Sequence, residues 1–252
     1  MKGIFITGTD TDVGKTWVAA GLTVALRQRG VKAVYFKPVQ SGCPETGGRL
    51  IPTDADFARN LAGLTEPLEV LTPIALRLPL APGVAAAQAG VVVDLEIIAA
   101  SLRDLAERYD FFVVEGAGGL YVTLVGTHFL VLDLIRWLGL PLAVVAHSGL
   151  GTINHTVLTV KAAQAAGIES SPAGATPGGN SLVVWSDLLV PRLRQDWTQW
   201  VAALVEGTVV FGAPRCATGS RILCMVSRHV LAGSPGKVWY SGSHVHFAGW
   251  RN

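Results

Sequence analysis

Short apolar runs alternate with longer segments of helical periodicity along the first two thirds of this chain. A short apolar run bounded by turn residues is typical of a buried strand, whereas apolar residues three and four positions apart indicate one face of a helix. Such runs occupy residues 2–7, 33–36, 111–114 and 140–146, and helical spacing is found at 17–29, 54–64 and 94–108. This alternation predicts an α/β fold with a mostly parallel sheet, helices on both faces, and ligands at the carboxyl ends of the strands.

The first apolar run ends in Gly-Thr-Asp-Thr-Asp-Val-Gly-Lys-Thr, residues 8–16, which resembles a phosphate-binding loop. Bound phosphates need inward-pointing backbone N–H groups, a cation and a hydroxyl for Mg²⁺; Gly14, Lys15 and Thr16 would meet these needs. Thr9 stands where the common pattern G-x-x-x-x-G-K-[ST] has its first glycine, which indicates a subgroup. An ordinary turn and helix start is the alternative. The strand, loop and helix order favours the phosphate loop.

Charged side chains also follow two later strands at the points where those strands end. Lys37 begins Lys-Pro-Val-Gln-Ser-Gly, and Glu115 begins Glu-Gly-Ala-Gly-Gly. Alone, each segment would be an ordinary solvated strand end or loop, but a carboxylate directly after Phe-Phe-Val-Val is costly without a cation partner. Beside a phosphate loop, Glu115 stands where nucleotide-hydrolysing folds hold a metal-directed carboxylate. Asp54 is either a further carboxylate of this kind or the N-cap of the helix that begins there.

Composition restricts the class of protein further. The 252 residues are 50% hydrophobic with a net charge of +2, which suits a sizeable core and gives no reason to expect a nucleic-acid partner. No membrane span or signal peptide is expected, because charged loop residues arrive by Asp10 and no uncharged apolar stretch reaches about 18 residues; a cytoplasmic location is predicted. Cys43, Cys216 and Cys224 lack the C-x-x-C spacing of a zinc site, and they indicate no disulfide framework.

Five segments together resemble the dethiobiotin synthetase family, in its order and at about its spacing, over roughly residues 1–169. They are Gly-Thr-Asp-Thr-Asp-Val-Gly-Lys-Thr, Lys-Pro-Val-Gln-Ser-Gly, Thr-Asp-Ala, Glu-Gly-Ala-Gly-Gly-Leu and Gly-Leu-Gly-Thr-Ile-Asn-His. The resemblance implies a P-loop NTPase-like core. It also implies an ATP-dependent carboxylase that closes the ureido ring of dethiobiotin from 7,8-diaminopelargonate and CO₂ or bicarbonate, with Mg²⁺ as cofactor and ATP as co-substrate.

The resemblance also assigns roles to individual residues. Lys37 and Lys15 are the expected catalytic residues, and Mg²⁺ is expected at Thr16, Asp54 and Glu115. The residues expected to bind ATP are Asp12, Val13, Gly14, Lys15, Thr16, Trp17, Asp54, Glu115, Gly116, Ala117 and Gly118. The residues expected to bind substrate are Thr11, Ser41, Leu150, Gly151 and Asn154.

Residues 148–155, Ser-Gly-Leu-Gly-Thr-Ile-Asn-His, open a helix that is expected to run to about residue 166. Free backbone N–H groups at a helix start suit a carboxylate, although a simple helix start explains the segment equally well. By resemblance, this segment binds the substrate carboxylate across a subunit interface, which implies a homodimer. His147 and His155 have no evident metal partners in the sequence and are interpreted as structural.

Beyond residue 169 the composition changes, which divides the chain into a synthetase core, 1–169, and a divergent tail, 170–252. The tail holds five of the seven tryptophans, and it has seven Lys/Arg against three Asp/Glu, whereas the core has 13 against 15. The family continues after Ala-Gly-Ile with a strand such as Val-Ala-Gly-Trp, but this chain has Ser-Ser-Pro-Ala-Gly at 170–174. Codons for residues 171–174 can spell Val-Ala-Gly-Trp one base earlier, so we hypothesise a frameshift near residue 170. A poorly ordered tail or a small basic module is the alternative, and the residues that recognise adenine stay unassigned.

Three other interpretations of the core are retained. A partitioning-type P-loop ATPase shares the fold and acts as a switch, but it usually carries a second lysine early in its phosphate loop, where this chain has Gly-Thr-Asp. An amidotransferase-type synthetase would normally need a glutaminase domain, for which the chain has no room. The third is a synthetase remnant that the altered tail has inactivated.

Overall fold

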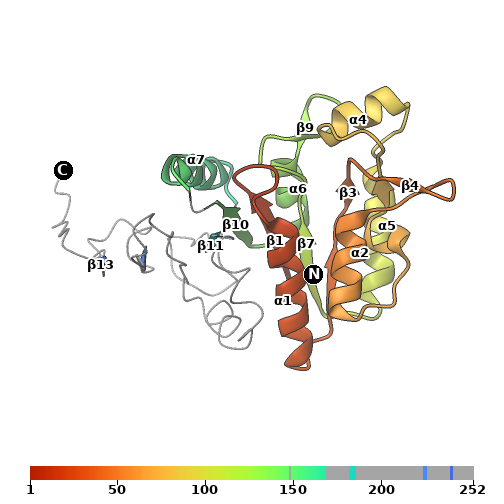
Figure 1. Ribbon diagram of the computed structural model, residues 1–252, viewed down its shortest axis with the longest axis horizontal. Helices are drawn as coiled ribbons and strands as arrows, with labels where there is room; N and C mark the ends of the chain where they lie inside the picture. The colour runs from red at the N-terminus through yellow and green to blue at the C-terminus, as the bar shows by residue number, and fades with distance from the viewer. Residues whose placement is uncertain (148, 169–181, 186–223, 226–238, 241–252) are drawn as a thin grey trace.

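The computed structural model describes residues 1–147, 149–168, 182–185, 224–225 and 239–240 of the chain. Its centre is a five-stranded sheet in which all neighbouring strands run parallel, with helices packed around it (Figure 1). The structure therefore confirms the predicted α/β class with a parallel sheet.

The main sheet has the strand order β11-β10-β1-β7-β2. Its middle strand is β1, in which Phe5 lies opposite Leu142 of β10 on one side and Val114 of β7 on the other. Parallel neighbours need a crossover connection, and each connection here includes at least one helix. The strands are β1 (Gly3–Gly8), β2 (Ala33–Phe36), β7 (Phe111–Glu115), β10 (Leu142–Ala146) and β11 (Leu182–Trp185).

Helices cover both faces of this sheet. Every residue of β2 and β10 is buried, and successive side chains of a strand point to opposite faces, so these strands must be covered on both sides. α1 packs across β1, β2 and β7 and against α2, while α7 packs on β10. The helices are α1 (Lys15–Gln28), α2 (Thr53–Ala62), α3 (Leu68–Leu71), α4 (Pro82–Ala89), α5 (Leu95–Ala106), α6 (Val131–Leu138) and α7 (Thr152–Ala165).

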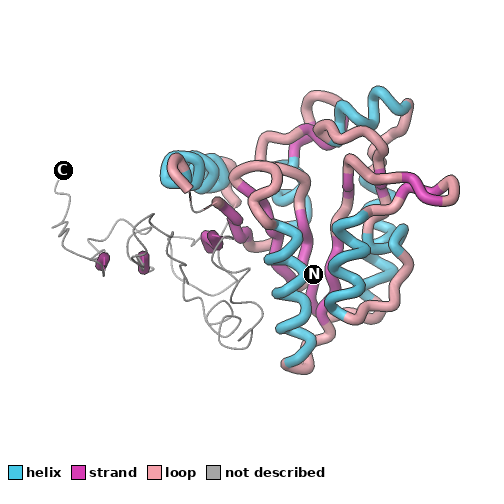
Figure 2. The backbone as a smooth tube through the Cα atoms, in the orientation of Figure 1, coloured by secondary structure: helices cyan, strands magenta, loops and turns pink. Residues whose placement is uncertain are grey.

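Short two-stranded ladders lie outside the main sheet (Figure 2). The hairpin of β4 and β5 turns at Gly47 and Gly48, whose φ angles of 59° and 78° suit the two-residue turn that matches strand twist. The residues that follow Lys37 form β3, which pairs in parallel with β6 outside the main sheet. The pairs are β3 (Val39–Gln40) with β6 (Ile74–Ala75), β4 (Glu45–Thr46) with β5 (Arg49–Leu50), β8 (Thr123–Val125) with β9 (Phe129–Leu130), and β12 (Cys224–Met225) with β13 (Trp239–Tyr240).

The strands and helices expected within residues 1–169 are all found, with ends shifted by a few residues. The expected frameshift near residue 170 lies outside the described residues, and so does most of the tail, 170–252, for which poor order was the alternative. In the tail, β11 pairs in parallel with β10, Ala143 lying opposite Leu182. These four residues therefore add a fifth strand to the edge of the main sheet beside β10.

In the described part of the chain, no helix is both long and apolar enough to cross a membrane. The longest helices, α1 and α7, have 14 residues each, whereas a spanning helix needs about 20.

Candidate active site

The predicted phosphate loop joins β1 to α1 at the carboxyl end of the central strand. Gly14 precedes the helix with φ of 91°, and Asp12 also adopts a positive φ of 56°. Gly8 has no room for a side chain, because a Cβ there would lie 2.7 Å from the carbonyl oxygen of Asp10. No side chain caps the start of α1, and its first turn holds no acidic residue. The N–H groups at the start of this helix are therefore suited to an anion.

Lys15 lies folded over this loop. Its Nζ donates a hydrogen bond to the carbonyl oxygen of Asp10 at 2.8 Å, and only 6% of the residue is exposed. Burial lowers the pKa of Lys15, an effect that the nearby carboxylate of Glu115 opposes in part. A buried ammonium of this kind would gain by meeting phosphate oxygens, and phosphate binding by Lys15 stays a prediction.

The glycine-rich segment after β7 packs directly on the phosphate loop. The N–H of Gly8 donates to the carbonyl oxygen of Gly118 at 3.3 Å, and a Cβ on Gly119 would lie 3.3 Å from the carbonyl oxygen of Gly8. A Cβ on Gly116 would lie 2.8 Å from the ring of Phe5. Glycines are needed here for close approach, so the segment is part of the site rather than a free loop.

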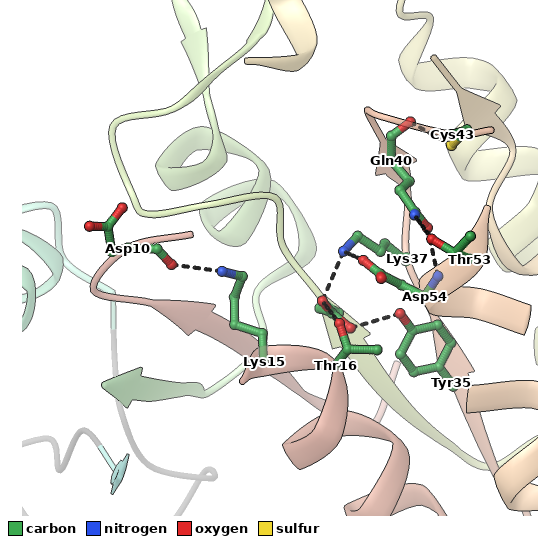
Figure 3. A network of polar contacts seen from close by, with 10 residues as sticks. Asp10, Lys15, Thr16, Tyr35, Lys37, Gln40, Cys43, Thr53 and Asp54 are labelled. Carbon is green, nitrogen blue, oxygen red and sulfur yellow. Dashed lines mark hydrogen bonds and ion pairs between the residues drawn. The ribbon is translucent and has the colours of Figure 1, made fainter. Parts of the chain in front are cut away.

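Four polar side chains from separate elements meet beside the loop (Figure 3). The Oε1 atom of Glu115 accepts hydrogen bonds from Thr16 Oγ1 and from Lys37 Nζ, both at 2.8 Å. Lys37 Nζ also forms an ion pair with Asp54 Oδ2. We call Thr16, Lys37, Asp54 and Glu115 the carboxylate cluster.

Two members of the carboxylate cluster, Lys37 and Glu115, are shielded from solvent, whereas Thr16 and Asp54 are partly exposed. Lys37 is 5% exposed and Glu115 is 1% exposed. Burial disfavours the charged form of Lys37, but the carboxylates of Glu115 and Asp54 outweigh it and raise the pKa of the lysine. Lys37 is therefore an ammonium at neutral pH and balances the carboxylates around it.

Asp54 lies in the first turn of α2, and its interpretation as an N-cap is wrong. The helix is preceded by Pro52, and no side chain caps it in the usual way. Instead, Gln40 reaches this end of the helix: its Oε1 accepts from the N–H of Asp54 at 3.2 Å and its Nε2 donates to Thr53 Oγ1 at 2.9 Å. With its backbone held by Gln40, Asp54 is free to direct its carboxylate at Lys37.

The oxygen donors in the cluster suit Mg²⁺. This ion prefers oxygen ligands and usually takes one or two carboxylates together with phosphate oxygens and waters. The Thr16 hydroxyl and the Glu115 carboxylate are in contact, and Lys37 joins them to Asp54. Among the described residues, no group of three or more His, Cys, Asp or Glu side chains could hold a metal by itself. The cluster fits a metal that arrives with a nucleotide.

The remaining residues expected to bind ATP lie in the phosphate loop, in the first turn of α1 or in the glycine-rich segment after β7. Val13 is fully buried under it, and the exposed ring of Trp17 packs edge-on against Phe57 with centroids 4.6 Å apart. Ala117 lies in the glycine-rich segment and is partly buried. The Trp17 side chain therefore joins α1 to α2.

The expected substrate residues fall into two groups. Thr11 belongs to the phosphate loop, and its Oγ1 lies near Gly118. Ser41 directly follows β3 and so belongs to the segment after Lys37. Leu150, Gly151 and Asn154 are exposed at the start of α7, which follows β10. β10, the strand that precedes α7, is three strand positions from β2, about 14 Å across the sheet, so the second group and Lys37 follow well-separated strands.

Sequence reasoning missed two contributors to the site, Tyr35 and Gln40. Tyr35 was assigned only to a buried strand, yet its hydroxyl donates to Oε2 of Glu115 at 2.7 Å. A hydroxyl in a strand that is otherwise apolar was the available signal, because buried polar groups need partners. Gln40 was quoted within a motif but given no role.

Comparison with known proteins agrees with this geometry. A family model described as an AAA domain matches residues 2–171. The ATP-dependent dethiobiotin synthetase BioD of Clostridium novyi (strain NT) is 43% identical over 170 residues, which cover 66% of this chain and 71% of that protein. The enzyme of the same name from Anaeromyxobacter dehalogenans (strain 2CP-C) is 48% identical over 170 residues, covering 67% and 73%. The one from Anoxybacillus flavithermus (strain DSM 21510 / WK1) is 44% identical over 169 residues, covering 67% and 75%.

The parallel sheet, phosphate loop and carboxylate cluster define an ATP-binding P-loop protein. Within that class, the chain belongs to the dethiobiotin synthetase family, as its motifs predicted. Members of this family are ATP-dependent ligases of biotin biosynthesis.

Proposed function

We propose that this chain carboxylates 7,8-diaminopelargonate and closes its ureido ring to give dethiobiotin, with ATP as co-substrate. The observation that carries the proposal is the carboxylate cluster. It combines an ammonium, a hydroxyl and two carboxylates next to a phosphate loop, and its lysine stays charged at neutral pH. Such a site suits chemistry that brings several negative charges together.

The proposed reaction has three steps. One substrate amine adds to CO₂ and loses a proton, which gives a carbamate. A carbamate oxygen then attacks the γ-phosphorus of ATP, ADP leaves, and a carbamic–phosphoric anhydride results. The second amine attacks the carbamate carbon, phosphate leaves, and the ring closes. Catalysis by the protein is mainly positioning and electrostatic stabilisation.

We assign the roles of the chain's own residues as the sequence suggested. Lys15 and the N–H groups of residues 12–17 bind the phosphates, and the segment at 116–118 closes against them. Lys37 neutralises the carbamate and the transferred phosphoryl group, since its ammonium lies at the centre of the cluster. Thr16, Asp54 and Glu115 would hold Mg²⁺, which supplies charge neutralisation at the phosphates when bound.

We further propose a homodimer in which α7 of one subunit binds the substrate carboxylate beside Lys37 of the other. Two observations support this. The start of α7 lies three strands from β2 in its own chain. It also exposes apolar side chains that a partner would cover: Leu150, Ile153, Val157 and Leu158 are all more than half exposed.

The synthetase unit is proposed to span residues 1–169, with 170–252 as a divergent tail of which β11 pairs with the main sheet. The extent of the family match, residues 2–171, supports this boundary. Reading the coding sequence tests the frameshift hypothesis directly, since an undisturbed reading frame through residue 170 would end it. We also propose a cytoplasmic location, where ATP and reducing conditions for the buried free thiol of Cys43 are available.

The test is Mg²⁺-dependent ADP release by the purified full chain, with and without 7,8-diaminopelargonate plus bicarbonate. Stimulation by the diamine, lost in Lys15→Ala, is expected for a synthetase. Equal ADP release without the diamine would instead indicate a switch-type ATPase. No release from protein that is folded and binds nucleotide would identify an inactive remnant.

A further inference from the structure

The hydroxyl of Tyr35 is buried in a strand that has no other polar side chain. Tyr35 lies in β2 between Val34 and Phe36, and all three residues are 0% exposed. A phenylalanine would fill this position without burying a hydroxyl, which is costly unless it is hydrogen-bonded. The hydroxyl is bonded, because it donates to Oε2 of Glu115 at 2.7 Å (Figure 3).

The sheet register accounts for this contact. Tyr35 lies directly opposite Val113, two residues before Glu115 on β7. Residues two apart on a strand point to the same face, so Tyr35 and Glu115 share a face of the sheet as diagonal neighbours. The contact joins residues 80 positions apart, and it is fixed by two strands rather than by a loop.

The two oxygens of Glu115 are used differently. Oε2 accepts a hydrogen bond from Tyr35, whereas Oε1 accepts hydrogen bonds from Thr16 and Lys37. Thr16 belongs to the phosphate loop, and Lys37 is paired with Asp54. Rotation of the carboxylate would break the Tyr35 bond in a site where Glu115 is 1% exposed and water cannot replace it. The hydroxyl of Tyr35 therefore fixes the orientation of the carboxylate, with one oxygen turned toward Tyr35 and the other toward the phosphate loop.

We propose that Tyr35 is a positioning residue that holds the Glu115 carboxylate in the orientation that offers one oxygen to the Mg²⁺ of a bound nucleotide. The proposal rests on the proposed function, because it assumes that Glu115 takes part in metal binding. Tyr35 touches neither nucleotide nor metal under this proposal and acts only through Glu115. Groups that orient a metal ligand typically contribute about 10–100-fold to metal affinity.

The test is calorimetric binding of a non-hydrolysable ATP analogue to the full chain, with and without Mg²⁺. In Tyr35→Phe we expect the affinity without metal to equal that of the unchanged protein, since Lys15 and the phosphate loop are intact. The gain in affinity on adding Mg²⁺ should fall by about tenfold. A purely structural role for Tyr35 would instead weaken both affinities together.

Tyr109→Phe is a matched control. Tyr109 also donates its hydroxyl to a buried carboxylate, that of Glu66, but this pair is separate from the carboxylate cluster. The control should lose some stability and keep the full Mg²⁺ effect. An unchanged Mg²⁺ effect in Tyr35→Phe, or an equal loss in Tyr109→Phe, would overturn the proposal.

A second measurement does not depend on the folding of Tyr35→Phe. With 3-fluorotyrosine introduced at position 35 alone, the ¹⁹F resonance should shift when Mg²⁺ is added to the nucleotide complex, because Glu115 changes its partner at Oε1. The absence of a shift would refute the proposal. If the unchanged protein bound the analogue equally well with and without Mg²⁺, the proposed metal site itself would fail, which distinguishes the two failures.

Discussion

Replacing Lys37 with methionine tests the electrostatic role of this lysine in the carboxylate cluster. Methionine is similar to lysine in length and fills irregular buried space, so Lys37→Met removes the ammonium and keeps most of the packing. Glu115 then keeps its hydrogen bonds from Thr16 and Tyr35 but loses its cation. The buried carboxylate then has no ion-paired cation and keeps only its electrostatic interaction with Lys15.

The expected loss in the free energy of unfolding is about 3 kcal/mol. Removing one partner of a buried ion pair costs about 3–5 kcal/mol. The lower end applies because Glu115 retains two donors, and because the Asp54 side chain is 32% exposed and its share of the pairing is screened. For a folded unit of this size, the loss corresponds to a decrease in Tm of about 6–12 °C.

Urea and thermal unfolding of the nucleotide-free protein at pH 7 measure this loss. Lys32→Met is the control, because Lys32 is exposed just before the same strand and its replacement should cost less than about 0.5 kcal/mol. Lys37→Met should also abolish turnover while nucleotide affinity persists. A loss below about 1 kcal/mol, or an equal loss in Lys32→Met, would refute the dependence of Glu115 on Lys37.

Three further predictions concern the phosphate loop, the start of α2 and the start of α7. Burial lowers the pKa of Lys15 from 10.5, and bound phosphates would raise it again, so nucleotide binding just below pH 10.5 should take up a proton. Calorimetry in buffers of different ionisation enthalpy measures this uptake. Gln40→Ala should cost about 1–2 kcal/mol in urea unfolding and weaken Mg²⁺-dependent nucleotide binding, because the backbone of Asp54 loses its partner. Ile153→Asp should give a monomer in analytical ultracentrifugation, because Ile153 is 72% exposed on the proposed interface.

Each of these predictions has a control and a contrary result. Lys15→Arg stays charged and should take up no proton, so uptake in that variant would assign the proton elsewhere. Full Mg²⁺ dependence in Gln40→Ala would show that Asp54 needs no support. Leu61→Asp places a charge on another exposed apolar residue, on α2 and away from the proposed interface, and should leave the assembly unchanged. A monomeric unchanged protein, or a dimeric Ile153→Asp, would contradict the proposed interface.

Strongly patterned parts of the chain could be predicted from sequence, and weakly patterned parts could not. The strands β2, β7 and β10 are continuous apolar runs, and the phosphate loop has a local motif with its own chemistry. α4 was missed because Pro-Gly-Val-Ala-Ala-Ala-Gln-Ala has no polar face to give a helical period. α6 was missed because it directly follows the apolar strand β9, so a single apolar run conceals two elements.

The site shows the same limit. Lys37, Asp54 and Glu115 were predicted because each is a charged residue next to a strand end or a helix start. Tyr35 was not, since a tyrosine in a buried strand fits the apolar pattern, and only the register with β7 shows where its hydroxyl lies. A contact between residues 80 positions apart does not affect the local spacing of apolar residues, so that spacing cannot predict it.

The central position of β1 has a consequence for synthesis of the protein on the ribosome. Phe5 pairs with Val114 and Leu142, so the first strand to emerge receives its neighbours more than a hundred residues later. At about 5–20 residues per second, the nascent chain carries this apolar strand without partners for about 5–20 s. The site cannot assemble before Glu115 has emerged, so the phosphate loop is made about a hundred residues before the carboxylate that completes the cluster.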